Sequence, residues 1–227
     1  MQGRKNLIIV IVILWAAVGL ANPINGGVKL DIQYDKKKLE AGELQVFTHQ
    51  IASGEQGETK RVVGVLLIDA PPEKVWETLE HWDAMGEYIP SLEYYRTVQV
   101  LKPVADDTPG ESLIEGKLKA AFISIRYTLH VTFDKANLRQ DWKLISKEEM
   151  KRLRKENSGL KESSATLKDI RGFEYIEPYG DGAKTIYYYA PVVEVSMPVP
   201  AWVERQLSKS SLNEYMEGVK KKVEASR

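Results

Sequence analysis

The stretch Ala121-Phe-Ile-Ser-Ile-Arg-Tyr-Thr-Leu-His-Val-Thr-Phe133 alternates apolar and polar side chains, and only Phe122 departs from the alternation. Because successive side chains of a strand point to opposite faces, this strand has one apolar face and one polar face. The pattern is typical of an antiparallel sheet with one covered face and one face in water. The apolar face consists of Ala121, Ile123, Ile125, Tyr127, Leu129, Val131 and Phe133.

Seven further segments also have the character of strands. The spacers between them are rich in Gly, Pro and Asp, which are turn signals. One spacer, Lys147–Asn157, is long and highly charged, and we interpret it as a solvated excursion between strands. The other predicted strands are Glu43–Ile51, Lys60–Ile68, Leu92–Leu101, Glu111–Lys119, Asn137–Ile145, Gly172–Tyr179 and Lys184–Val195.

Helical patterns flank the strands. Pro72 suits the first turn of a helix with Val75 and Trp76 on one face, and Trp82–Ile89 forms a second short turn. The chain closes with a pattern from Pro200 to about Ala225, which as a helix extends about 37 Å. We therefore predict one α+β domain in which a curved antiparallel sheet wraps around a long C-terminal helix. The apolar stripe of that helix consists of Leu212, Tyr215, Met216, Val219 and Val223.

Residues 1–21 have the pattern of a secretory signal peptide. Arg4 and Lys5 precede the apolar run Leu7–Leu20, and the small residue Ala21 follows it. The run is shorter than the roughly 18–20 residues that a membrane-spanning helix usually needs. We predict cleavage after Ala21 and a periplasmic or secreted protein. An uncleaved signal anchor in the inner membrane is the alternative.

The composition of the chain restricts its domain organisation and the kinds of partner and site that it can have. Residues 22–42 are rich in Gly, Asn and Lys, so we predict a linker or disordered arm there and a folded domain over 43–226. The chain has 32 basic and 32 acidic residues, which argues against a nucleic-acid partner. The absence of cysteine excludes a disulfide framework, a thiol nucleophile and a cysteine-ligated metal. We expect a monomer.

The sequence contains few residues suited to catalysis. The histidines, His49, His81 and His130, do not have the spacing of metal ligands, and neither a nucleophile elbow nor a nucleotide-binding loop occurs. We therefore predict no catalytic residues, no metal and no cofactor. Arg126 and His130 share the polar face of the 121–133 strand. They would enter the interior as an acid/base pair only if a bulge inverted the register.

Several stretches resemble a known family. Val65-Leu-Leu-Ile-Asp-Ala-Pro-Pro-Glu-Lys-Val-Trp-Glu-Thr-Leu79, followed by Met85-Gly-Glu-Tyr-Ile-Pro90, resembles the opening of START-like (SRPBCC) domains. This superfamily includes bacterial proteins grouped with polyketide cyclases and coenzyme-Q-binding proteins. The resemblance covers about Glu43 to Val223. Further matching pieces are Asp169–Phe173, Gly182–Thr185, Val199–Val203 and Ser210–Asn213.

The resemblance implies a helix-grip fold with a hydrophobic cavity between the curved sheet and the C-terminal helix. It also implies binding of a lipid or other apolar molecule, often without catalysis. The chain departs from the family at His81, where an aspartate is common, so no role is carried over to that position. The Lys147–Asn157 segment is also longer than the connection that the family has.

Aromatic residues occur in nearly every predicted element. They provide an apolar enclosure with hydroxyl groups at intervals, which suits a ligand that is mostly hydrocarbon with one polar end. Ordinary core packing is the alternative for each ring. We choose the candidates by strand and helix alternation, and a slipped register would exchange the set. The candidate ligand-binding residues are Trp82, Tyr88, Ile89, Ile123, Ile125, Tyr127, Leu129, Trp142, Phe173, Tyr175, Tyr188, Tyr215 and Met216.

We therefore predict an exported START-like domain that binds a lipid or other hydrophobic small molecule and acts as a carrier. Met85–Pro90 and Met197–Trp202 would form lips of the cavity and contact a membrane transiently during ligand exchange. Two alternatives stay open. One is a cyclase/aromatase-type or hydrolytic enzyme that uses the same cavity. The other is a non-binding envelope accessory protein that recognises its partner through Lys147–Asn157.

Overall fold

The computed structural model describes residues 29–53, 57–120, 123–156, 159–161, 163–164, 167–195 and 201–226, without the side chains of residues 49–53, 57–60, 120, 123, 195 and 201–209. The predicted signal peptide lies outside the described residues. So does most of the second predicted lip, since only the backbone of residues 201 and 202 is described.

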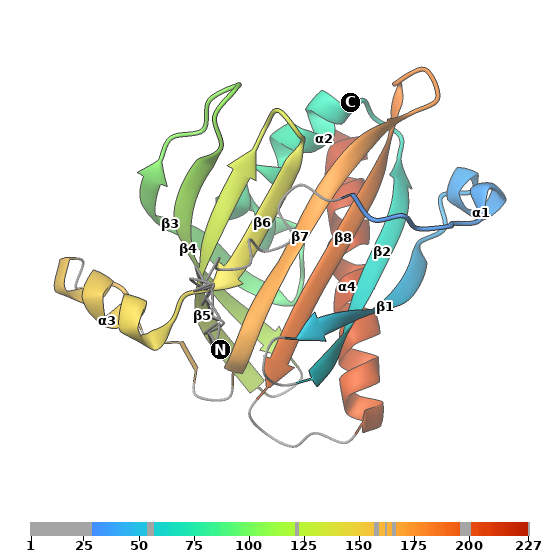
Figure 1. Ribbon diagram of the computed structural model, residues 1–227. Helices are drawn as coiled ribbons and strands as arrows, with labels where there is room; N and C mark the ends of the chain where they lie inside the picture. The colour runs from blue at the N-terminus through green and yellow to red at the C-terminus, as the bar shows by residue number, and fades with distance from the viewer. Residues whose placement is uncertain are drawn as a thin grey trace, which may run out of the picture.

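Eight antiparallel strands form one sheet in the order β1-β2-β8-β7-β6-β5-β4-β3 (Figure 1). Each strand pairs with its neighbours in antiparallel register, as the alternation predicts. β7 begins five residues earlier than predicted. The first residues of the strand include Leu167 and Ile170, which are buried, but the charged Lys168 and Asp169 between them hide the strand pattern in the sequence. The strands are β1 Gln45–Ser53, β2 Gly57–Ile68, β3 Leu92–Lys102, β4 Gly110–Ala120, β5 Ile123–Asp134, β6 Arg139–Leu144, β7 Leu167–Tyr179 and β8 Lys184–Val195.

The helices lie on both faces of the sheet. α4 (Ala201–Ala225) runs along one face, with α2 (Pro72–Leu79) and the short helix η2 (Trp82–Glu87) beside it. We call this the inner face. On the outer face, the segment that leads into α1 (Lys36–Glu40) crosses the strands, and α3 (Lys147–Glu156) packs near β4 (Figure 1). None of the helices among the described residues combines the length and apolar character needed to cross a membrane.

The predictions for two segments are corrected, and both segments lie on the outer face of the sheet. The predicted linker is part of the folded domain from Lys29 onwards, because Leu39 is fully buried and Asp35 accepts hydrogen bonds from the first backbone N–H groups of α1. The charged Lys147–Asn157 segment contains α3, whose Met150 and Leu153 are buried in a small apolar cluster. In both segments, a few apolar residues among many lysines provide the packing face.

The inner face and α4 are held in close contact through β2. A methyl group on Gly64 would lie 2.2 Å from Sδ of Met216 and 3.0 Å from Cδ2 of Leu212, far closer than nonbonded atoms normally approach. Val63 and Val65, the neighbours of Gly64, are buried on the outer face. Glycine at position 64 therefore lets α4 pack closely against the sheet.

We predict that Gly64→Ala destabilises the domain by about 1–3 kcal/mol through overpacking against Met216. Urea unfolding measures this effect. The double variant with Met216→Ala removes the clashing sulfur, so the two changes should be strongly non-additive. Simple additivity of the two destabilisations would show that the contact between Gly64 and α4 is not the cause.

Candidate ligand site

Aromatic rings fill the space between the inner face and α4. Tyr189 of β8 stacks on Tyr215 of α4 with ring centroids 4.3 Å apart, and on Trp142 of β6 at 5.6 Å. Trp142 in turn meets Trp82 of η2 at 6.1 Å, and Trp82 meets Tyr95 of β3 at 4.8 Å. These contacts make one continuous row of rings from the helix across the sheet.

Two buried polar side chains lie on the inner face among these rings. Gln140 of β6 and Glu174 of β7 are direct cross-strand neighbours, and the Cβ atoms of such pairs are about 5 Å apart. Oε1 of Gln140 accepts a hydrogen bond from Nε1 of Trp82 at 2.7 Å, and Oε2 of Glu174 accepts one from the Tyr187 hydroxyl.

The second polar atom of each side chain has no partner. Nε2 of Gln140 and Oε1 of Glu174 make no hydrogen bond and have no surface that water can reach. A buried polar atom in this state costs about 1–3 kcal/mol, so two adjacent ones in a well-packed core require an explanation. We call Gln140 and Glu174 the polar pair.

Burial sets the charge of this region. It raises the pKa of Glu174 from its ordinary value near 4.5 to about 8, and the hydrogen bond from Tyr187 opposes this only in part. The carboxyl group is therefore protonated at neutral pH. Burial also raises the pKa of Tyr187, Tyr189 and Tyr215 well above the usual range. Glu174 and these hydroxyl groups are all uncharged at pH 7.

Most of the residues predicted to bind the ligand lie on the inner face. Tyr88 and Ile125 are partly buried against the main core. The side chain of Ile123 lies outside the described residues. The predicted residues within the core itself are Trp82, Ile89, Tyr127, Leu129, Trp142, Tyr215 and Met216.

Three predicted site residues lie on the outer face of the sheet and not between the sheet and α4. Phe173, Tyr175 and Tyr188 belong to a separate apolar cluster on the outer face, where Tyr175 and Tyr188 stack at 4.4 Å. Their neighbours Glu174 and Tyr189 point inward instead. Aromatic residues occupy successive positions of β7 and β8, so aromatic character alone could not identify the inner face.

The candidate residues chosen from the sequence do not include the polar pair, Tyr95, Tyr187 or Tyr189. A signal for Glu174 is present, since a single carboxylate interrupts the apolar run Phe173-Glu-Tyr-Ile176. Gln140 lies in the polar-looking strand Arg-Gln-Asp-Trp-Lys-Leu of β6. Nothing in the pattern of that strand marks one polar residue as the buried one.

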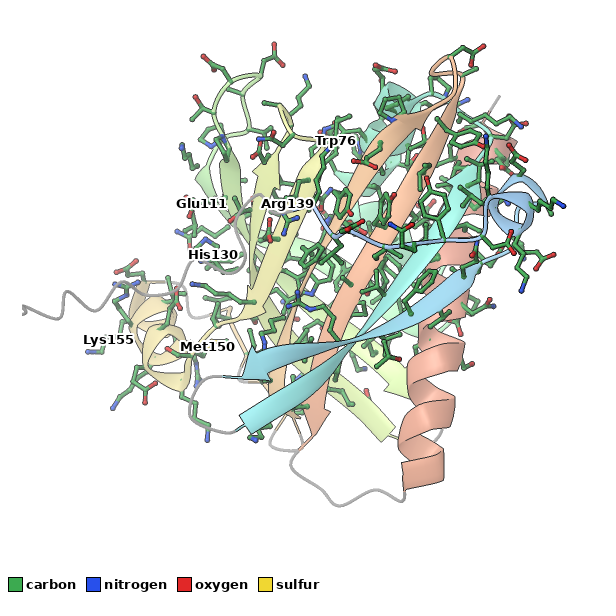
Figure 2. All side chains as sticks on the ribbon, turned by 45° about the vertical axis from the view of Figure 1, so that its right-hand side comes forward. Trp76, Glu111, His130, Arg139, Met150 and Lys155 are labelled. Carbon is green, nitrogen blue, oxygen red and sulfur yellow. The ribbon has the colours of Figure 1, made fainter. Side chains whose placement is uncertain are left out.

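The proposed acid/base pair of Arg126 and His130 does not enter the space between sheet and helix. On β5, Tyr127, Leu129 and Val131 point inward, so both residues point to the outer face. Nε2 of His130 lies 2.8 Å from Oε2 of Glu111, beside α3 (Figure 2). In the part of the chain that the structure describes, no cluster of three or more potential metal-ligating residues occurs.

The surroundings of the polar pair are closed, but a surface hollow lies nearby. A hollow of about 530 Å³ runs beside α4 and is lined by Tyr88, Pro90 and Gly218, among others. The Tyr88 hydroxyl is buried and has no hydrogen-bond partner, and its pKa is raised above the usual range by burial first and by Glu174 second. Tyr88 thus lines the surface hollow and has a buried hydroxyl without a hydrogen-bond partner.

Comparisons with known proteins define the fold. No protein-family model matches the chain, and no curated protein matches it in sequence. Among solved structures, a START superfamily protein from Mycobacterium smegmatis superposes with a TM-score of 0.56, at 15% identity, over 74% of this chain and 99% of that one. A STAR-related lipid transfer protein from Xanthomonas axonopodis gives 0.57, at 13% identity, over 80% of this chain and 93% of that fragment.

A third similar structure is the Zhui aromatase/cyclase from Streptomyces sp. R1128, with a TM-score of 0.55, at 10% identity, over 72% of this chain and 93% of that one. These likenesses, together with the curved sheet and its terminal helix, show that the chain has the START-like (SRPBCC) helix-grip fold. The fold class implied by the sequence resemblance is therefore confirmed.

We predict that the protonated Glu174 makes stability depend on pH. The group binds a proton in the folded state up to about pH 8 but loses it near pH 4.5 when unfolded. Stability should therefore fall by about 1.4 kcal/mol per pH unit as pH rises through this window. Glu174→Gln removes the titration at nearly constant size. Urea unfolding of both proteins from pH 5 to 8 tests this, and parallel curves would contradict it.

Proposed function

We propose that the protein binds an apolar ligand in the space between the inner face and α4. The observation that carries this proposal is the polar pair, with two unpartnered atoms, inside a wall of aromatic rings. A half-satisfied polar group makes a core less stable than an apolar one would be. Ligand sites, by contrast, are mostly apolar with a few convergent polar groups. The arrangement therefore suits recognition better than it suits stability.

The similar structures support a lipid-like ligand. One of them is named a lipid transfer protein and another an aromatase/cyclase. We propose a carrier rather than an enzyme, because Arg126 and His130, the acid/base candidates of the sequence, lie on the outer face. A carrier needs only to enclose and release its ligand, and burying hydrocarbon contributes about 0.8 kcal/mol per CH₂ group.

We propose that the ligand enters beside Tyr88. The rings close the space around the polar pair, so binding requires some of them to move. Tyr88 is suited to this movement because it lines the surface hollow and its buried hydroxyl makes no hydrogen bond that would hold the side chain in place. The Tyr88 ring also lies 5.6 Å from Nζ of Lys222, whose cation–π contact favours the closed position.

The site can be located with the methionines of the chain. Met85 and Met216 are buried in the inner core, and Met150 is buried under α3 on the outer face. With ¹³C-methyl methionine and an equimolar mixture of dodecane, dodecanol and dodecanoate, the NMR signals of Met85 and Met216 should shift. The signal of Met150, an internal control, should not. Unchanged Met85 and Met216 signals with all three compounds would refute the proposal.

We further propose that the chain is exported and that its signal peptide is cleaved after Ala21, as the N-terminal pattern predicts. Mass spectrometry of the protein from the native host should then give a mature form that begins at Asn22. A form that retains Met1 and sediments with membranes would instead favour the signal-anchor alternative.

A further inference from the structure

The inference here rests on the proposed function and concerns the polar end of the ligand. Each member of the polar pair is oriented by one partner and leaves its other atom without one. Trp82 holds Oε1 of Gln140, so the amide Nε2 is the end left to donate. Tyr187 holds Oε2 of Glu174, so Oε1 is the end left for another group. The two open atoms come from directly paired residues on neighbouring strands.

The charges around the polar pair determine which polar groups of a ligand can bind beside it. Among the described residues, the buried basic side chains are Arg61 and Arg139. Both lie over the ring of Phe173 on the outer face, with guanidinium carbons 4.8 and 4.1 Å from the ring centroid. Among the described side chains, which do not include those of residues 201–209 in α4, the inner face thus has no buried basic group to balance an anion, and burying an unbalanced charge is costly. The surrounding tyrosine hydroxyls add no charge.

We propose that the space between sheet and α4 selects ligands whose polar end is an uncharged oxygen, such as a hydroxyl or carbonyl group. This oxygen accepts a hydrogen bond from Nε2 of Gln140 and pairs with the free oxygen of Glu174. The hydrocarbon part of the ligand lies against the aromatic row. Apolar molecules that end in a carboxylate or phosphate are rejected, because they lose their hydration without gaining a cation.

Three probes of equal chain length test this proposal: dodecane, dodecanol and dodecanoate, each delivered from cyclodextrin to the full-length protein. Titration at pH 7, followed at the Met85 and Met216 methyl signals, should show dodecanol binding about tenfold or more tightly than dodecanoate. Dodecane should bind more weakly than dodecanol, because it leaves the polar pair unpaired. The preference over dodecanoate should shrink as the pH falls and the probe becomes a neutral acid.

The chain offers a matched control for the role of Glu174. Glu115 of β4 is equally buried, with one oxygen bound by Tyr94 and Arg96 and the other without a partner, but it points to the outer face. Glu174→Leu should abolish the preference for dodecanol over dodecane, whereas Glu115→Leu should leave it unchanged. Should Glu174→Leu fail to fold, the ranking of the three probes by the unmodified protein still decides the matter.

The outcomes separate this inference from the proposed function. If none of the probes shifts the signals of Met85 and Met216, binding in this space is itself refuted. If the probes bind there but dodecanoate binds as tightly as dodecanol at pH 7, the proposed function stands and the selection for an uncharged end is overturned. An unchanged ranking in Glu174→Leu would also overturn it.

Discussion

A curved antiparallel sheet must bury its apolar inner face, and here it does so mainly against one long helix, α4, with α2 and η2 beside it. α4 meets this need with Leu212, Tyr215, Met216, Val219 and Val223, all buried. The absence of a side chain at Gly64 lets Met216 and Leu212 of the helix pack closely against β2. Large aromatic rings fill the rest of the space between the sheet and α4, so the packing that closes the fold also forms the candidate ligand site.

Residue alternation predicted most of the fold but only part of the site. The 121–133 stretch could be interpreted correctly because its apolar residues occupy every second position, and Tyr127 and Leu129 are buried as expected. In β7 and β8 both faces of the sheet are covered, the inner face by α4 and the outer face by residues 29–40. Apolar residues therefore follow one another without alternation, and Tyr188 could not be distinguished from Tyr189.

The polar pair was beyond sequence reasoning for a different reason. Its significance lies in which hydrogen bonds are made and which are missing, and this depends on Trp82 and Tyr187, which come from other elements. Glu115 shows the difficulty, since it too is a buried glutamate within a strand. Only the arrangement in space separates a carboxyl group that faces the helix from one that faces away from it.

The proposed ligand selection depends on a neutral Glu174 side chain that faces the space between the sheet and α4. Infrared difference spectroscopy tests it most directly, because the carbonyl stretch of a protonated carboxyl group is separate from the bands of carboxylates. At pH 7, the spectrum of the unmodified protein minus that of Glu174→Gln should contain a protonated-carboxyl band that shifts when dodecanol is added. A difference spectrum with only carboxylate bands, or a protonated band that dodecanol does not move, would contradict the account.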